Sequence, residues 1–153
     1  MAGPQSSPPK SGRPSRPKRR FTVAQANSTL PLVKRIVRDI VKAHADVLRC
    51  QAELERLGGK AQPVKAQFAR AHQEAQDRLG TRVEHLEDLV DELTEVGCEL
   101  KDYRIGLIDF TGRHQGRDVC LCWKLGEERI GYWHELDAGF AGRQPIASLR
   151  ETE

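Results

Sequence analysis

The chain has 153 residues, a formal net charge of +3 and a mean hydropathy of −0.61, which together indicate one soluble domain with a modest core. Residues 1–20 contain six basic residues and no acidic one, so the rest of the chain carries a net charge of −3. A negative body argues against a general nucleic-acid-binding domain, because phosphate contacts need a clustered positive patch. No apolar run approaches the ~20 residues of a membrane-spanning helix, which argues against membrane insertion.

The first 20 residues form a basic tail with five prolines and no large apolar residue after Met1. Such a segment buries too little surface to offset its ordering entropy, so we expect it to be disordered. It lacks the apolar stretch of a signal peptide, which favours a cytoplasmic location. A solubilising extension is the simplest interpretation. The alternative is a weak tether for nucleic acid through Lys18, Arg19 and Arg20.

Capping signals and apolar spacing predict a first long helix. Thr22, with Gln25 three residues later, forms a potential capping box, and Phe21 precedes it as part of a hydrophobic staple. Pro31 indicates a new helix start, since proline suits the first helical position. Residues 32–57 then place apolar side chains at alternating steps of three and four, a stripe that needs a partner.

That partner is predicted directly after the glycine pair at residues 58–59. Apolar residues continue the same spacing from residue 62 to residue 97, and the short connection makes the two helices an antiparallel hairpin. Gly80 followed by Thr81 leaves open whether the second segment is one helix or two stacked helices, because an interior glycine costs about 1 kcal/mol.

The composition changes after Gly97 to β-branched and aromatic residues with turn signals between them. Three strands are predicted, at residues 103–110, 118–125 and 128–134. The second and third are expected to pair as an antiparallel hairpin across the short turn Gly126-Glu127.

These elements predict an α+β fold, in which a long antiparallel helical hairpin packs with a small antiparallel β-sheet. The hairpin covers residues 21–97, and the β unit with its C-terminal loop covers residues 98–147 of the same domain. A disordered basic N-terminal tail precedes this domain, and residues 148–153 are expected to fray.

Three stretches of sequence resemble a known family. They are FTVAQANSTLPLVKRIV in the first helix, then GCELKDYRIGLIDF and VCLCWKLGEERIGYWHELDAGFAGRQPI in the C-terminal part. Over about residues 21–146 they resemble the prokaryotic domain-of-unknown-function 2203 family. The resemblance implies a bacterial or archaeal cytosolic protein, and it supplies no catalytic residue. The basic tail lies outside it.

Ionisable and aromatic residues are concentrated in the C-terminal third. Aromatic rings beside ionisable groups are typical of a ligand pocket, although the same residues could seal a small sheet against helices. No subset matches a reaction template, so the sequence leans against an enzyme and identifies no cofactor. The candidate ligand-binding residues are Asp109, Trp123, His134, Glu135, Asp137 and Arg143.

The string His134-Glu135-x-Asp137 suggests a metal site. In a continuous strand His134 and Glu135 point to opposite faces and cannot chelate together. If the chain turns there, His134 and Asp137 could converge, with Asp109 or His114 as a third ligand. The HExxH spacing of zinc peptidases is absent.

The two cysteines at residues 120 and 122 could supply at most half of the ligands of a metal site built on thiolates. Cys120 and Cys122 lie on one face of a predicted strand, and the other half could only come from Cys98 and a histidine. A free cysteine packs well as a small hydrophobe, so a core or sheet-face role is the simpler interpretation. Without an export signal, all four cysteines, including Cys50, are expected to be reduced.

A glycine-containing segment, Gly139–Arg143, could form a backbone nest for an anion, closed by Arg143. The alternative is an ordered loop in which Arg143 ties back to Asp137 or Glu135. Neither a phosphate-binding GxxxxGK[ST] loop nor a GxSxG nucleophile motif is present.

The preferred functional interpretation is an interaction or assembly module. Two helices cover each other's apolar stripes incompletely, so a second copy is expected to complete the packing and form a homodimer. One alternative is a small-ligand module that binds an anion or a metal through the C-terminal loop. The other is a nucleic-acid-associated protein that uses its basic tail.

Overall fold

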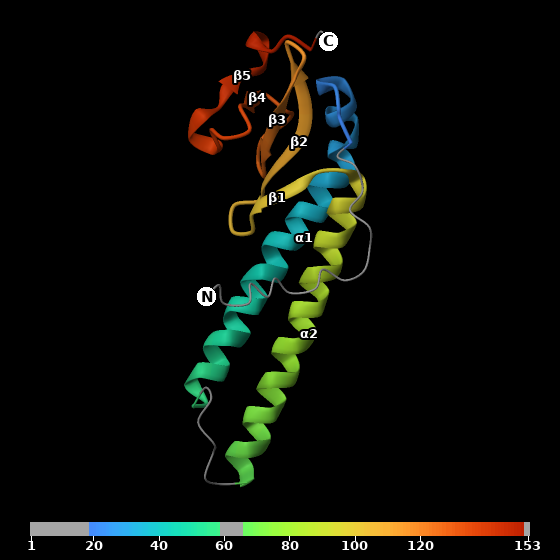
Figure 1. Ribbon diagram of the computed structural model, residues 1–153. Coiled ribbons are helices and arrows are strands. Elements are labelled where there is room, and N and C mark those ends of the chain that lie inside the picture. Colours follow the sequence, from blue (N-terminus) through green and yellow to red (C-terminus); the bar gives the residue numbers. More distant parts are fainter. Residues whose placement is uncertain (1–18, 59–65, 152–153) are drawn as a thin grey trace, which may run out of the picture.

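The computed structural model describes residues 19–58 and 66–151 and has the predicted α+β fold. Two long helices, α1 (Val23–Arg56) and α2 (Ala66–Val96), form an antiparallel hairpin, and a small sheet sits beside the end where α1 begins and α2 finishes (Figure 1). Most of the basic tail and the predicted start of the second helix lie outside the described residues. No helix in the described ranges is long and apolar enough to cross a bilayer.

The α1 N-terminus is capped as predicted. Thr22 Oγ1 accepts a hydrogen bond from the Gln25 amide (3.1 Å), and Gln25 Oε1 accepts one from the Thr22 amide (2.9 Å). The predicted new start at Pro31 is wrong, because α1 runs through this proline without interruption. The Ser28 and Thr29 hydroxyls donate to carbonyls three residues earlier, which adds hydrogen bonds in the turn that loses the proline amide.

The second helix is one continuous element. It passes Gly80 without a break, and Thr81 Oγ1 donates to the Asp77 carbonyl one turn earlier (3.1 Å) instead of capping a new helix. The penalty for one exposed glycine is small compared with the packing of the remaining apolar stripe on α1.

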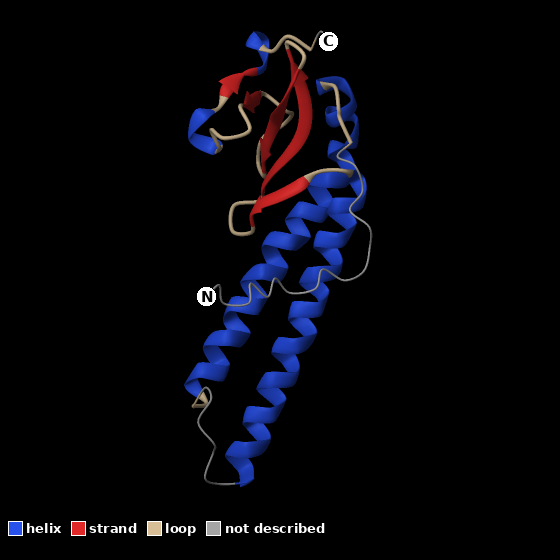
Figure 2. Ribbon diagram, in the orientation of Figure 1, coloured by secondary structure: helices blue, strands red, loops and turns tan. Residues whose placement is uncertain are grey.

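Five antiparallel strands form the sheet, and each pairs with its neighbour in sequence (Figure 2). The strands are β1 (Glu99–Asp102), β2 (Leu107–His114), β3 (Arg117–Lys124), β4 (Tyr132–His134) and β5 (Gln144–Pro145). Since β2, β3 and β4 are the central strands, side chains on all three can meet on either face.

The predicted strand at residues 103–110 is wrong in its first half. Asp102 Oδ1 accepts hydrogen bonds from the amides of Arg104 and Ile105 (2.8 and 3.1 Å), and this turn separates β1 from β2. The strand also extends beyond its predicted end at residue 110, because β2 continues to His114 and a two-residue turn follows it. In that turn Gln115 and Gly116 adopt φ of 49° and 79°, as a tight hairpin requires.

The predicted pairing of the last two strands is confirmed, but the turn between them is longer than expected. Only Tyr132–His134 of the predicted third strand pairs with β3. Residues 125–131 form the connection, in which Glu127 Oε1 accepts a hydrogen bond from the Lys124 amide (2.7 Å).

One face of the sheet packs against α1 and forms the core. Val119, Leu121 and Trp123 share this face, as the alternation predicts, and all three are fully buried. The same cluster includes Ile108, Phe110 and Trp133 from the sheet and Val33, Val37 and Ile40 from α1. The residues between these positions, including Asp109 and Cys122, therefore face the other side of the sheet.

Candidate metal centre

Three potential metal ligands lie on the sheet face that points away from α1. Asp109 of β2 is the cross-strand partner of Cys122 of β3, and His134 follows on β4. All three are buried, with exposed fractions of 6%, 0% and 3%. A buried carboxyl and a buried imidazole need hydrogen-bonding or charged partners, because burying an unpaired polar group costs free energy.

The ligand atoms of these residues converge. His134 Nε2 lies 3.2 Å from Asp109 Oδ1, and the sulfur of Cys122 joins them in a group whose atoms all lie within 4.8 Å of one another. Because β2 and β4 are two strands apart, the His134 and Asp109 side chains meet above β3, beside Cys122.

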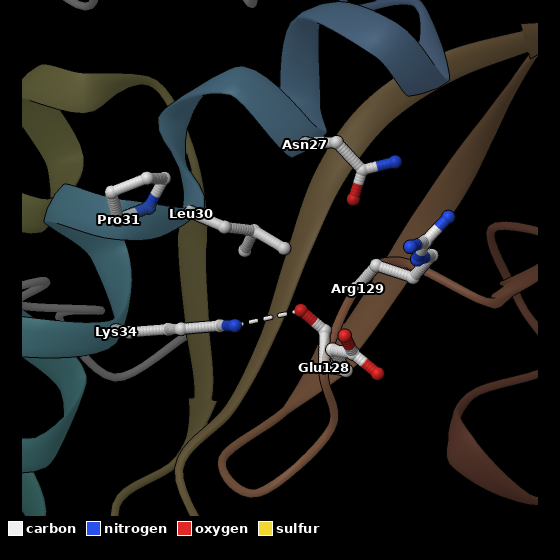
Figure 3. A pocket seen from close by; sticks show the side chains of 6 residues that line it. All are labelled: Asn27, Leu30, Pro31, Lys34, Glu128 and Arg129. Carbon is white, nitrogen blue, oxygen red and sulfur yellow. Dashed lines mark hydrogen bonds between the residues drawn. The ribbon is translucent and has the colours of Figure 1, made fainter.

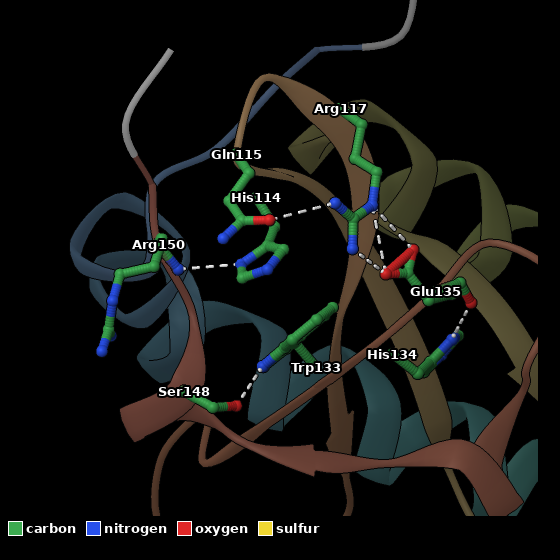
Figure 4. Close-up of polar contacts among 8 residues, drawn as sticks. All are labelled: His114, Gln115, Arg117, Trp133, His134, Glu135, Ser148 and Arg150. Carbon is green, nitrogen blue, oxygen red and sulfur yellow. Dashed lines mark hydrogen bonds and ion pairs between the residues drawn. The ribbon is translucent and has the colours of Figure 1, made fainter.

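The His134 ring is oriented as a metal ligand would be. Its Nδ1 lies 2.7 Å from the Glu135 carbonyl (Figure 4), and because a carbonyl only accepts, Nδ1 must carry the hydrogen. If Nε2 carries no hydrogen, its lone pair faces the carboxylate oxygen of Asp109 at 3.2 Å. This contact is repulsive unless a positive charge lies between them, either a proton or a metal ion.

Cys122 is held as a thiol in the metal-free protein. Burial, reinforced by the negative charge of Asp109, raises the pKa of the Cys122 thiol to about 12, and Arg143 acts in the opposite direction. The raised pKa favours the thiol at neutral pH, and a coordinated transition metal would favour the thiolate by adding positive charge.

Arg143 lies next to this thiol. Its Nη2 donates to Glu127 Oε1 (2.6 Å), and its guanidinium lies 4.1 Å from the centre of the Tyr132 ring. The expected tie to Asp137 or Glu135 is therefore wrong. The Arg143 Nε is buried without a hydrogen-bond partner within the described ranges. A thiolate at Cys122 would add negative charge beside this guanidinium.

The Gly139–Arg143 segment forms a short 3₁₀ turn (Phe140–Gly142). The amides of Gly142 and Arg143 donate to the carbonyls of Gly139 and Phe140 (3.0 and 3.3 Å). These two amides are therefore already used and do not point together toward an anion.

The other predicted site residues lie elsewhere. Trp123 is on the opposite, core face, where its Nε1 donates to the Glu127 carbonyl (3.0 Å). Glu135 pairs at the surface with Arg117, whose hydrogen bond lowers the pKa of the Glu135 carboxyl (Figure 4). Asp137 is exposed.

The proposed convergence of His134 with Asp137 or His114 is not observed, since the cluster contains Asp109 and Cys122 instead. His114 stacks on Trp133 (4.4 Å between ring centres), and its Nδ1 accepts a hydrogen bond from the Arg150 amide (2.9 Å).

Cys122 is the member of the cluster that the ligand prediction missed. The expected partners of the two strand cysteines were Cys98 and a histidine. A histidine, His134, does join Cys122. Cys98 does not, because it is buried near the end of α2, where its sulfur lies 3.8 Å from the Leu93 carbonyl. The only signal in the sequence was the Cys120-x-Cys122 spacing, which places two thiols on one strand face without showing what lies opposite them.

The structure also has a shallow pocket of about 390 Å³ between α1 and the β3–β4 connection (Figure 3). Its polar groups form hydrogen bonds between α1 and the β3–β4 connection. Lys34 Nζ donates to the Glu128 carbonyl (2.7 Å), and Asn27 Oδ1 accepts from the Ile130 amide (2.8 Å). The lining residues are Asn27, Leu30, Pro31, Lys34, Glu128 and Arg129, none of which belongs to the metal-ligand cluster.

Comparison with known families matches residues 19–146 to the family described as "Uncharacterized conserved protein (DUF2203)". The match spans both the helical hairpin and the sheet, and it includes every residue of the cluster. No curated protein and no solved structure matches the chain. The chemistry of the site is therefore the main guide to function.

Proposed function

Since the chain belongs to the DUF2203 family of uncharacterized conserved proteins, whose description names no activity, we propose a function from the site itself. The protein binds one divalent transition-metal ion, preferentially Zn²⁺, through Asp109, Cys122 and His134. The observation that carries this proposal is the convergence of three buried ligand atoms of different types within 4.8 Å of one another.

The donor set favours zinc over the common hard cations. Ca²⁺ and Mg²⁺ prefer all-oxygen sites, whereas a thiolate and an imidazole suit Zn²⁺ and similar metals. Zinc bonds of about 2.0–2.3 Å place tetrahedral ligand atoms about 3.5 Å apart. The 3.2 Å between His134 Nε2 and Asp109 Oδ1 is close to that value, so small side-chain rotations would complete the geometry.

Charge balance supports the same proposal. A deprotonated Cys122 and an ionised Asp109 would be two buried negative charges, which a divalent cation neutralises. The nearby Arg143 is already paired with Glu127, so it cannot neutralise both of them.

Metal analysis of the purified chain tests this proposal. We expect protein produced in zinc-supplemented medium and purified without chelator to contain one zinc per chain by elemental analysis and native mass spectrometry. A strong chelator should remove the metal, and the stripped protein should take up one Co²⁺ per chain. Substoichiometric zinc together with no uptake of Co²⁺ would contradict the proposal.

Self-association through the helical hairpin is a second candidate. The end of the hairpin where α1 finishes and α2 begins extends beyond the sheet (Figure 1). Leu48 in the C-terminal part of α1 and Phe68 in the first turn of α2 are 49% and 50% exposed. Along all of α2 only Ala75, Leu89 and Leu93 are buried. A second hairpin packed on this surface would cover such side chains in a four-helix arrangement.

Light scattering coupled to size exclusion tests the second candidate. We expect wild-type protein at micromolar concentration to have the mass of a dimer. Because the exposed apolar side chains would lie in the interface, the double substitution Leu48→Ser and Phe68→Ser should give a folded monomer. Leu136→Ser, which removes an exposed leucine from the C-terminal loop, is the matched control. A wild-type protein that is a strict monomer would rule this candidate out.

A further inference from the structure

A second cysteine lies on the same sheet face as the proposed metal ligands. Cys120 precedes Cys122 by two residues on β3, so both side chains lie on the same face of the sheet. Its direct cross-strand partner is His134, whereas the partner of Cys122 on the other side is Asp109. Cys120 is half-buried.

The strand register places the ion between the two cysteines. His134 lies opposite Cys120 and Asp109 lies opposite Cys122, so the diagonal between the His134 and Asp109 backbone positions crosses β3 between the two cysteines. Residues two apart on a strand are separated by about 6.6 Å, so an ion at the midpoint lies about 3.3 Å to the side of each. That offset is within the reach of one S–C bond plus one zinc–sulfur bond of about 2.3 Å.

Cys120 would join the group by moving its side chain, since its backbone position is set by the strand register. Its sulfur lies outside the converged group of three ligand atoms, but its backbone is held by the β2 and β4 pairings on both sides.

We infer that Cys120 is the fourth ligand, so that the ion is enclosed by one carboxylate, two thiolates and one imidazole. This inference rests on the metal-binding function proposed above. Four protein ligands fill a tetrahedral site and leave no position for an activated water. The ion would then act as a structural clamp that joins β2, β3 and β4, and the site would not perform metal-assisted hydrolysis.

Counting sulfur ligands in the loaded protein tests this inference. In the Co²⁺-loaded full chain we expect thiolate-to-cobalt charge-transfer absorption from two thiolates, and X-ray absorption of the zinc form should show two sulfur neighbours. Cys120→Ser and Cys122→Ser should each lower the charge-transfer intensity by about half. Cys50→Ser, which changes a half-buried cysteine on α1, is the matched control and should leave the spectrum unchanged.

The outcomes separate the two proposals. A single sulfur neighbour, with a cobalt spectrum unaffected by Cys120→Ser, would overturn the fourth-ligand inference and leave the three-ligand site intact. Wild-type protein that takes up no Co²⁺ at all would overturn the metal-binding function itself. If Cys120→Ser fails to fold, as judged by circular dichroism, X-ray absorption of the wild-type zinc form still counts the sulfur ligands.

Discussion

Replacing His134 with alanine is expected to lower the Zn²⁺ affinity of the folded chain by more than about 100-fold, because even outer-shell changes cost 10–100-fold. His134 supplies the only imidazole of the cluster, and its removal also leaves Asp109 buried without its partner. Competition titration with a chromogenic chelator would measure the affinity directly.

The same substitution should abolish stabilisation by the metal. At a free Zn²⁺ concentration 1,000-fold above the dissociation constant, binding stabilises a folded state by about 4 kcal/mol, which corresponds to a rise in Tm on the order of 10 °C. We expect this rise in the wild type and not in His134→Ala.

The matched control is His85→Ala, which removes an exposed histidine from α2. This control should retain wild-type zinc affinity and the full thermal shift. Equal zinc affinities for His134→Ala and the wild type would show that the metal binds elsewhere.

Truncating Trp123 to alanine is expected to lower the free energy of unfolding by about 3–5 kcal/mol, the usual range for a buried tryptophan or phenylalanine. The indole is fully buried against the core, and its Nε1 donates to the Glu127 carbonyl at 3.0 Å. Urea unfolding followed by circular dichroism would measure the loss. Because Trp123 lies on the face opposite the metal ligands, protein that remains folded should still bind one zinc.

Two further variants make the Trp123 result interpretable. Trp123→Phe keeps most of the apolar volume and loses the hydrogen bond, so it should cost less than the alanine variant. Phe140→Ala truncates an aromatic residue that is 44% exposed and should have a small effect on stability. If Trp123→Ala unfolds as the wild type does but no longer binds zinc, then Trp123 is part of the site and not of the core.

Patterns formed by residues close in sequence were sufficient to predict the helical part of the fold. The capping box at Thr22 and the apolar stripes depend on residues close in sequence, and the structure confirms both. The two errors along the helices have one cause. Pro31 and Gly80 disrupt a helix when it stands alone, but here the packing of other apolar residues on the same helices outweighs the local penalty.

The sheet was harder to predict because its turns depend on single side chains. The Asp102 carboxylate ends β1 by accepting two backbone amides, and nothing in the apolar pattern indicates this. Gln115-Gly116 makes the β2–β3 hairpin, although asparagine or aspartate before the glycine is the stronger signal for such a turn.

The candidate metal centre could be predicted only in part, because its members come from three strands. Asp109, His134 and Arg143 stood out from the sequence by type, and the structure places all three at or beside the site. Cys122 joins them only once the register pairs it with Asp109. That register depends on the β2–β3 turn, which the sequence analysis did not identify.

The sequential order of the strands also has a consequence for how the protein folds. Each strand pairs with the strand before it, so the sheet can grow by closing short loops as the chain is synthesised. The segment that precedes α1 is the exception: Arg20 bonds to Asp118, 98 residues away, and the Phe21 amide donates to the Thr111 carbonyl. These contacts can form only after β2 and β3 have paired. We therefore expect this segment to bind the sheet late in folding, and its binding to fix the position of the start of α1.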